Sequence, residues 1–307
     1  MDMKFELTGY CHSNYALSFS QLGKPRKLPA CGGWVIERNI PGTTHSDCMG
    51  CYPLFSCKDW GKIHEDLIEI RSEMVSLTLV TDPFAPFDKA YLEKIFNIVK
   101  PYKNHFVADL HQDLNSFVNK KHRQKARSAL SIMQMEFCNE PLKYLNEWIV
   151  LYQNLVKRHS IIGIRAFSNE SFHRQLETDG MNIALCRICD EIIAAMLFIV
   201  DGDVAYTHLS AFSDKAYNVN ASFGLYWGVL NYLKELNVKF VDIGAGSGIS
   251  QSETDGLIRF KTGWSNTNRM VYLCGCILDG EKYAEVCRLK SIEGNNYFPS
   301  YRVGEFT

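Results

Sequence analysis

The residues best suited to chemistry lie in Lys239–Trp264, KFVDIGAGSGISQSETDGLIRFKTGW. A short apolar run ends in this stretch with a carboxylate, Asp242, and leads into three closely spaced glycines. Glycines allow a backbone to approach a cofactor or substrate closely, because they carry no side chain. Lys261 follows the loop and adds a cation. The stretch therefore combines a carboxylate, an ammonium group and an open backbone.

A second charged group is the run KKHRQKAR, Lys120–Arg127, with five Lys or Arg residues in eight positions. Positions 120, 123 and 127 share one face of a helix. Such a face is either a solvated surface or a binding face for phosphate or carboxylate groups. Both interpretations stay open.

Several cysteines raise the question of a metal site, since Cys48 and Cys51 form a C-x-x-C pair near Cys31, His45 and Cys57. A structural zinc site usually has a second ligand pair at regular spacing, and none follows here. We therefore expect no metal. The N-terminus lacks the apolar core of a signal peptide, so the 11 cysteines are expected to be reduced thiols in the cytoplasm.

The composition indicates an ordered globular protein, with 46% hydrophobic and 12% aromatic residues in 307. The net charge of −1 gives no general attraction to DNA or to anionic membranes. The most apolar window has nine residues, Ile192–Val200, whereas a transmembrane helix needs about 20. We expect no transmembrane segment.

The predicted elements mix helices and strands and divide the chain into two domains, 1–137 and 138–307. Tyr15–Ser20 has the composition of an early strand. Tight turns separate three strands within 182–209, which predicts an antiparallel sheet. A strong helix is expected at 221–236.

The glycine loop has one interpretation as the S-adenosylmethionine-binding loop of methyltransferases. That loop opens an amphipathic helix, but the residues after Gly248 are ISQSETD, with almost no apolar face. The chain after Gly248 is also too short for the rest of a doubly wound sheet. This interpretation is disfavoured.

The other interpretation uses more of the chain. The D-x-G at Asp242 and the G-L-x-x-F-K-x-G that ends at Gly263 resemble the late signature of FemAB-like members of the GNAT superfamily. The K-H-R-x-x-x-R run at Lys121–Arg127 resembles the helix that ends their first domain. The predicted order of strands and helices in the second half also resembles that of a GNAT domain. The resemblance extends over about 105–280.

This resemblance implies an α/β (α+β) fold of two tandem GNAT-like domains, each a mixed, mainly antiparallel sheet flanked by helices. It also implies a donor, usually acyl-coenzyme A, in a V-shaped opening between two strands. Backbone amides at a helix start would hold the pyrophosphate. The implied donor-binding residues are Asn220, Ala221, Ser222, Phe223 and Gly224.

In FemAB relatives the Phe-Lys pair lies beside the reacting ester, which implies substrate contact for Phe260 and oxyanion stabilisation by Lys261. An amine acceptor must lose a proton, so a base helps. The candidates are Asp242, which could instead cap the glycine turn, and His208, which could instead be a wall residue. Further substrate contacts are assigned to Arg123 and Tyr206.

We therefore predict an N-acyltransferase that moves an acyl group from a thioester such as acyl-coenzyme A to an amine, on a cell-envelope precursor or an amino sugar. The near-neutral charge favours a small donor over tRNA. Aminoacyl-tRNA, which FemAB relatives in the strict sense use, is the alternative donor, supported by Lys120–Arg127. The non-enzymatic alternative is a GNAT scaffold that binds a peptide or partner and catalyses no reaction.

Overall fold

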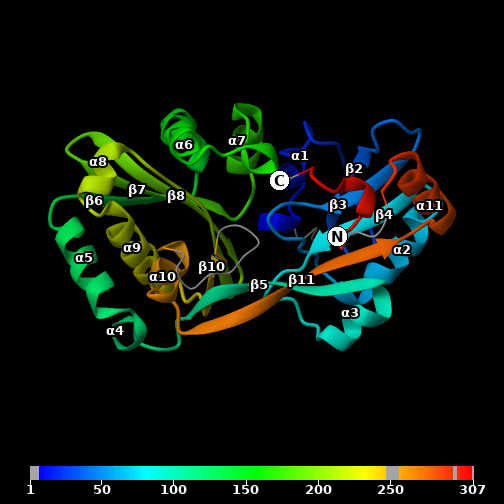
Figure 1. The fold of residues 1–307 in the computed structure, drawn as a ribbon. Helices are drawn as coiled ribbons and strands as arrows, with labels where there is room; N and C mark the ends of the chain where they lie inside the picture. Colours follow the sequence, from blue (N-terminus) through cyan, green and yellow to red (C-terminus); the bar gives the residue numbers. More distant parts are fainter. Residues whose placement is uncertain (1–6, 247–255, 293–295, 306–307) are drawn as a thin grey trace, which may run out of the picture. The chain divides into compact units, whose positions relative to one another are not determined.

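The computed structural model describes residues 7–246, 256–292 and 296–305 (Figure 1). The chain forms two compact units: unit 1 is Met1–Tyr102 with Val271–Thr307, and unit 2 is Lys103–Met270. This division differs from the predicted boundary at 137/138. Strands β5 (Ile98–Asp109) and β11 (Thr267–Ile277) each run from one unit into the other, so unit 1 takes both ends of the chain.

Unit 1 contains a mixed sheet with the order β1-β2-β3-β4-β11. Its other strands are β1 (Lys24–Lys27), β2 (Trp34–Asn39), β3 (Ser46–Gly50) and β4 (Met74–Val80). The neighbours are antiparallel except for the parallel pair β3 and β4. Its helices are α1 (Ser13–Leu17), α2 (Ile63–Ile70), α3 (Lys89–Ile95) and α11 (Gly280–Leu289), with 3-10 segments η1 (Gly9–Cys11), η2 (Trp60–Lys62) and η5 (Ser300–Arg302).

The strand predicted at Tyr15–Ser20 is wrong, because helix α1 occupies its first half and turns follow. His12 caps this helix, and its Nδ1 accepts a hydrogen bond from the Asn14 amide at 3.0 Å. Tyr15 and Phe19 are four residues apart, so both rings reach the same buried side, with centroids 5.5 Å apart. The apolar spacing of this segment is therefore helical.

Unit 2 contains a second mixed sheet segment with the order β5-β10-β9-β8-β7-β6. Its strands after β5 are β6 (Gln134–Cys138), β7 (Met181–Ile188), β8 (Glu191–Asp201), β9 (Val204–Phe212) and β10 (Phe240–Gly244). The neighbours are antiparallel except for the parallel pair β9 and β10. This arrangement confirms the antiparallel sheet predicted within 182–209, and both units confirm the predicted mixture of mainly antiparallel strands and flanking helices.

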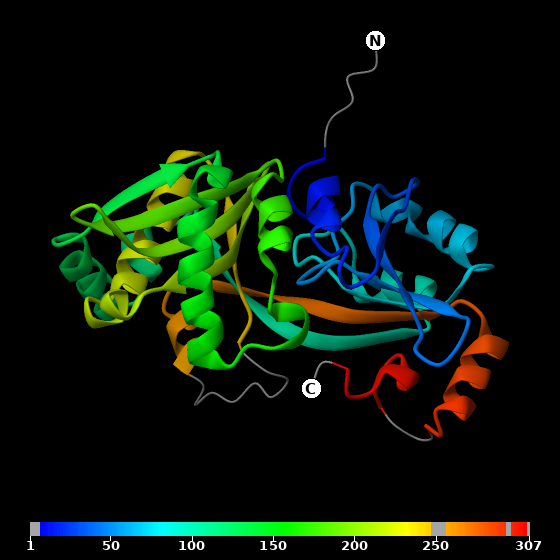
Figure 2. The ribbon, with the colours of Figure 1, turned by 90° about the horizontal axis from the view of Figure 1, so that it is seen from above.

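The helices of unit 2 cover both faces of its strands (Figures 1 and 2). On one face, α9 packs on β8 through the alternating residues Ala194, Met196 and Phe198, and α5 packs on α9. The other face carries α6 and α7. The helices are α4 (Leu114–Phe117), α5 (Lys120–Leu130), α6 (Leu145–His159), α7 (Asn169–Leu176), α8 (Asp214–Asn218), α9 (Ala221–Glu235) and α10 (Gly256–Thr262), with 3-10 segments η3 (Pro141–Tyr144) and η4 (Gly163–Arg165). Within the described ranges, no helix combines the length and the apolar character needed to cross a bilayer.

Candidate active site

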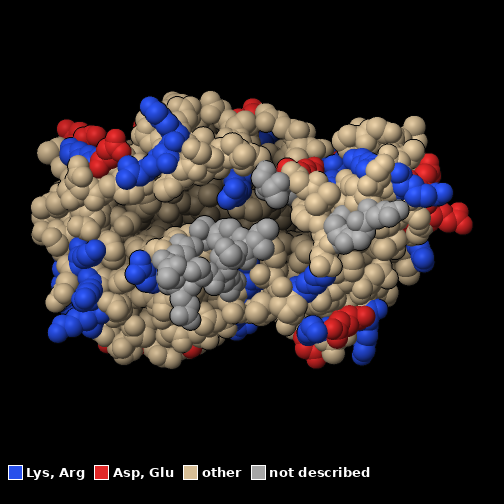
Figure 3. Space-filling view, in the orientation of Figure 1, with Lys and Arg blue, Asp and Glu red and all other residues tan. Residues whose placement is uncertain are grey.

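Strands β9 and β10 pair over only three residues, Phe240–Asp242 with Val204–Tyr206, and then separate. β10 ends at Gly244, whereas β9 continues to Phe212. The register between β9 and β8 shifts between Thr207 and Leu209, which leaves His208 as a bulge residue. The end of β10 therefore lies beside an opening between β9 and β10. The face of unit 2 that Figure 3 shows has a hollow below α6.

Asp242 is the buried carboxylate at this strand end, with 4% of its surface exposed. Its Oδ1 accepts the Gly244 amide at 2.7 Å, so the predicted cap of the glycine turn is present. Its Oδ2 lies 2.8 Å from Nδ1 of His105 on β5. Because a carboxylate accepts, the proton of a neutral His105 ring lies on Nδ1, and Nε2 has a lone pair. Nε2 makes no hydrogen bond with the part of the chain that the structure describes.

Two lysines lie at the same end of β10. Lys261 on α10 donates to the Ala245 carbonyl at 2.8 Å, and Lys103 on β5 donates to the Gly246 carbonyl at 3.2 Å. Burial lowers the pKa of Lys103, with a smaller effect from Arg165. Gly244 has φ +77°, and a Cβ there would lie 2.9 Å from the Lys261 Nζ. Glycine is thus needed both for the turn and for the approach of the ammonium.

Phe260, predicted to contact substrate, packs inside an aromatic cluster of unit 2. Its ring centroid lies 5.2 Å from Phe223, 5.0 Å from Tyr226 and 5.6 Å from His122. The cluster joins α10 to α9 and α5, and the Asn119 amide adds a hydrogen bond to the Gly263 carbonyl at 2.9 Å. Phe260 therefore fixes the helix that presents Lys261.

The predicted donor-binding segment forms the start of α9. Asn220 is left-handed, with φ 56°, and its side chain makes no capping hydrogen bond. Lys125 of α5 lies 4.6 Å from the centroid of Phe223, so a cation stands beside this helix start. Amides at a helix start and a nearby lysine favour an anion. Gly224 has another role, since a Cβ there would lie 2.1 Å from Met133 Cε, next to α5.

The Asn220 amide donates to the Tyr217 carbonyl at 3.3 Å, so an anion at the start of α9 would meet the amides of Ala221 and Ser222, while Gly224 serves the packing of α9.

Arg123 holds the corner between α4 and α5. Its Nε donates to the Val118 carbonyl at 3.1 Å and its Nη1 to Asn115 Oδ1 at 3.3 Å. Within the described ranges, no contact joins Arg123 to Asp242 or Lys261. It belongs to the basic α5, over which Lys and Arg atoms gather in Figure 3.

His208 and Tyr206 lie on β9. Nε2 of His208 is 3.0 Å from Oε1 of the buried Gln175 on α7, and burial lowers the pKa of His208 to about 3. A histidine with that pKa is a weak base at neutral pH. Tyr206 is buried and lies opposite Asp242 in the β9–β10 register.

The structure thus brings Asp242 and Lys261 to one strand end, with Tyr206 beside Asp242, and holds Arg123 and His208 by other contacts. The sequence analysis missed His105 and Lys103. Their spacing of two on β5 places both on one face of that strand, but only its pairing with β10 brings them to Asp242 and Gly246.

A family model described as an acetyltransferase (GNAT) domain matches residues 116–253. Residues 116–253 are thus similar to a GNAT-type domain. The matched range contains α9, His208 and Asp242, whereas Lys261 lies beyond it. No match to the sequence is found among curated proteins.

The chain is also similar to solved structures over most of its length. The crystal structure of FemX is 12% identical, with a TM-score of 0.68 over 89% of this chain and 93% of that chain. L-PGS from Bacillus licheniformis is 14% identical, with a TM-score of 0.55 over 92% of this chain and 97% of that chain. A conserved protein of unknown function from Bacteroides thetaiotaomicron is 14% identical, with a TM-score of 0.59 over 86% and 89%. The predicted FemAB-like fold is confirmed, and at these identities the similarity concerns the fold.

Proposed function

We propose that this chain is an N-acyltransferase whose reaction takes place at the end of β10. The observation that carries the proposal is the meeting of a buried Asp242–His105 pair with Lys261 at a strand end where β9 and β10 separate. Perturbed or paired titratable groups beside such an opening are typical of catalytic sites.

The chemistry follows from these groups. The acceptor nitrogen attacks the acyl carbonyl, a C–N bond forms, and the bond from carbon to the sulfur or oxygen of the donor breaks. Nε2 of His105 takes the proton that the nitrogen loses, and Asp242 holds the ring in the required tautomer. The ammonium of Lys261 stabilises the oxyanion of the tetrahedral intermediate, with Lys103 as a second cation. The leaving thiol or hydroxyl receives a proton at the end of the reaction.

For the donor we propose an acyl-coenzyme A thioester. The uncapped start of α9 at Asn220 and the adjacent Lys125 supply amides and a cation for its pyrophosphate. The acceptor is an amine, which we assign to a cell-envelope precursor or an amino sugar.

A second donor, aminoacyl-tRNA, is favoured by one specific observation. In α5 the cations Lys120, Lys121 and Arg127 form no ion pair with any described residue, and no acidic residue interrupts the helix. Such a surface suits a phosphate backbone. The reaction at the end of β10 would be the same, with a ribose oxygen in place of sulfur.

Native mass spectrometry and acyl-transfer assays test the proposal, with acetyl-coenzyme A, longer acyl-coenzyme A species and charged tRNA as donors and amino sugars and peptides as acceptors. We expect one donor to bind and its transfer to fall strongly in Lys261→Ala. The matched control is Lys239→Ala, which removes a surface ion pair with Asp203. Lack of binding by every donor would instead support a scaffold without catalysis.

A further inference from the structure

Unit 1 contains a pocket of about 610 Å³ that the proposed reaction does not use. It lies among three parts of unit 1: the segment around η1 and α1, the β1–β2 hairpin, and the residues that begin η2. Its volume is within the range of small-molecule sites. The lining residues that bear on its ligand are Cys11, His12, Lys27, Trp34, Lys58 and Lys62.

The charge of the lining is strongly positive. Lys27, Lys58 and Lys62 are exposed at the pocket and form no ion pair with any described residue. Among the lining residues the acidic side chain is Asp59, whose Oδ1 accepts the Gly61 amide at 2.9 Å. Three ammonium groups against one engaged carboxylate favour an anion with several charged oxygens.

An aromatic ring lies beside these cations. Lys27 and Trp34 are direct partners in the β1–β2 register, so their side chains lie on the same face of the hairpin. Trp34 is half-buried and is one of the lining residues of the pocket. A ligand with a flat ring could pack on this indole while its anionic group reaches the lysines.

The wall of the pocket is built rigidly. The buried Asp66 on α2 accepts the amides of Ala30 at 2.9 Å and Cys31 at 2.8 Å, which holds the turn of the hairpin. The Asp59 amide donates to the Cys31 carbonyl at 3.0 Å and ties the lysine-bearing segment to this turn. A pre-formed wall reduces the entropy lost on binding.

We propose that this pocket binds a phosphorylated small molecule with a flat ring, the phosphate near Lys58 and Lys62 and the ring on Trp34. The inference is independent of the proposed acyl transfer, because binding can be measured without any reaction.

Isothermal titration of the full chain tests it with AMP, adenosine and inorganic pyrophosphate as probes. We expect AMP and pyrophosphate to bind and adenosine to bind far more weakly. In Lys58→Gln/Lys62→Gln the Kd for AMP should rise about tenfold or more, because charge-assisted hydrogen bonds are lost. The matched control is Lys89→Gln/Lys94→Gln on α3, which removes the same charge away from the pocket and should change the Kd less than about twofold.

Trp34→Ala separates the contribution of the flat ring to binding from that of the phosphate. It should weaken the binding of AMP and leave the binding of pyrophosphate unchanged, whereas an equal loss of affinity for both would overturn the role of the ring. Because the substituted lysines are exposed, both double variants should melt like the wild type. The proposal is overturned if AMP and pyrophosphate do not bind at millimolar concentration, if adenosine binds as well as AMP, or if the two double variants behave alike.

Discussion

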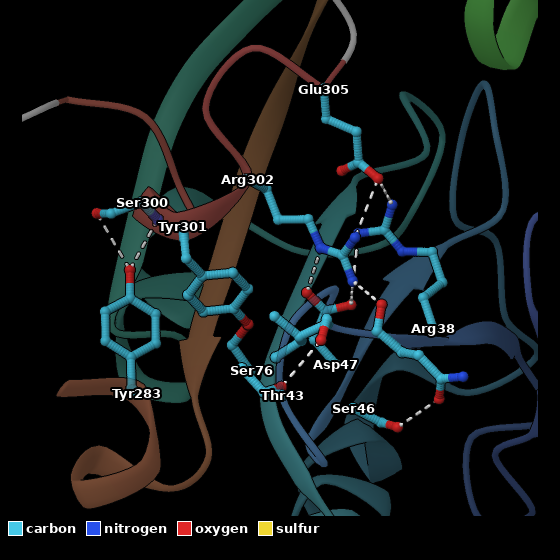
Figure 4. A network of polar contacts seen from close by, with 12 residues as sticks. Arg38, Thr43, Ser46, Asp47, Ser76, Tyr283, Ser300, Tyr301, Arg302 and Glu305 are labelled. Atoms are coloured by element: carbon cyan, nitrogen blue, oxygen red, sulfur yellow. Dashed lines mark hydrogen bonds and ion pairs between the residues drawn. The ribbon is translucent and has the colours of Figure 1, made fainter. Parts of the chain in front are cut away.

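Each unit buries one strand carboxylate next to cationic side chains. The two carboxylates differ in whether the side chains around them are paired with opposite charges or keep hydrogen-bonding capacity. In unit 1, Asp47 on β3 is fully buried and receives Arg302 in a two-point contact, Nε at 2.8 Å and Nη2 at 2.9 Å. Arg38 lies 3.4 Å from the same carboxylate and 2.9 Å from Glu305 (Figure 4). Each charge thus meets an opposite charge.

In unit 2, Asp242 is paired with His105, but the network remains open. Nε2 of His105 has no partner among the described residues, and Lys261 and Lys103 donate to main-chain carbonyls of the glycine loop. A closed network of charges fixes structure, whereas groups with remaining hydrogen-bonding capacity can act on a ligand. The difference favours a structural role for Asp47 and, under the proposed function, a reactive role for Asp242 and its neighbours.

The largest effect is expected for Asp47→Ala. Removing this carboxylate leaves Arg302 and Arg38 buried without compensation, so the free energy of unfolding should fall by about 3–5 kcal/mol. Urea unfolding measures the loss. The matched control is Glu73→Ala, which breaks an exposed pair with Arg26 and should change the curve little. Similar curves for both variants would contradict the structural role of Asp47.

The next effect is expected for Lys261→Ala, on catalysis and not on stability. Loss of an oxyanion-stabilising group lowers kcat by about 100-fold or more. The melting temperature should stay near that of the wild type, because the side chain is half-buried and donates to a main-chain carbonyl of the loop, not to a buried charge. If Lys261→Ala melted early and kept its kcat, Lys261 would be a structural residue like Arg302.

His105→Gln should lower kcat by about 100-fold and change the pH profile. Glutamine can donate to Asp242 but cannot take up a proton, so the limb on which the rate rises with pH should disappear. A pH–rate profile of kcat/KM for both proteins checks this. Survival of the rising limb in His105→Gln would show that another group is the base.

The sequence predicted the parts of both regions whose partners are local. Asp242 caps the turn two residues further on, and α9 has its predicted bounds within about one residue. Partners that lie far apart in the sequence could not be predicted, because His105 pairs with Asp242 across 137 positions and Arg302 with Asp47 across 255. Such pairs depend on strand register, which a local pattern does not specify.

Gly224 and the domain boundary show the same limit of local sequence patterns. Gly224 was assigned to a donor, but the space that a Cβ would need there is filled by Met133. The boundary at 137/138 also followed from local element order, whereas the units are set by two long strands, β5 and β11, that pass through both. Packing and long-range pairing decide these features.

Gly263→Ala tests the packing that supports the open site, with a smaller effect. A Cβ at 263 would lie 2.4 Å from Cε1 of His122, whose ring is enclosed by Phe223, Phe260 and Trp264. Overpacking of this kind costs about 1–3 kcal/mol. Thermal unfolding measures the cost. Gly256→Ala at the start of α10, the helix that Gly263 follows, is the control, since no atom lies within 4 Å of its Cβ position. Equal stability of both variants would mean that the His122 ring can move aside.

The effect expected from His208 appears only in acid. Burial holds its folded pKa at about 3, below the ordinary value near 6.5, so the unfolded chain binds the proton first as pH falls. Stability from this group is therefore complete above about pH 6.5 and is lost progressively toward pH 3. His208→Gln can still donate to Gln175 and should lose less melting temperature between pH 6.5 and pH 4 than the wild type. The exposed His159→Gln should follow the wild type, and if His208→Gln did so too, His208 would not be the group that titrates.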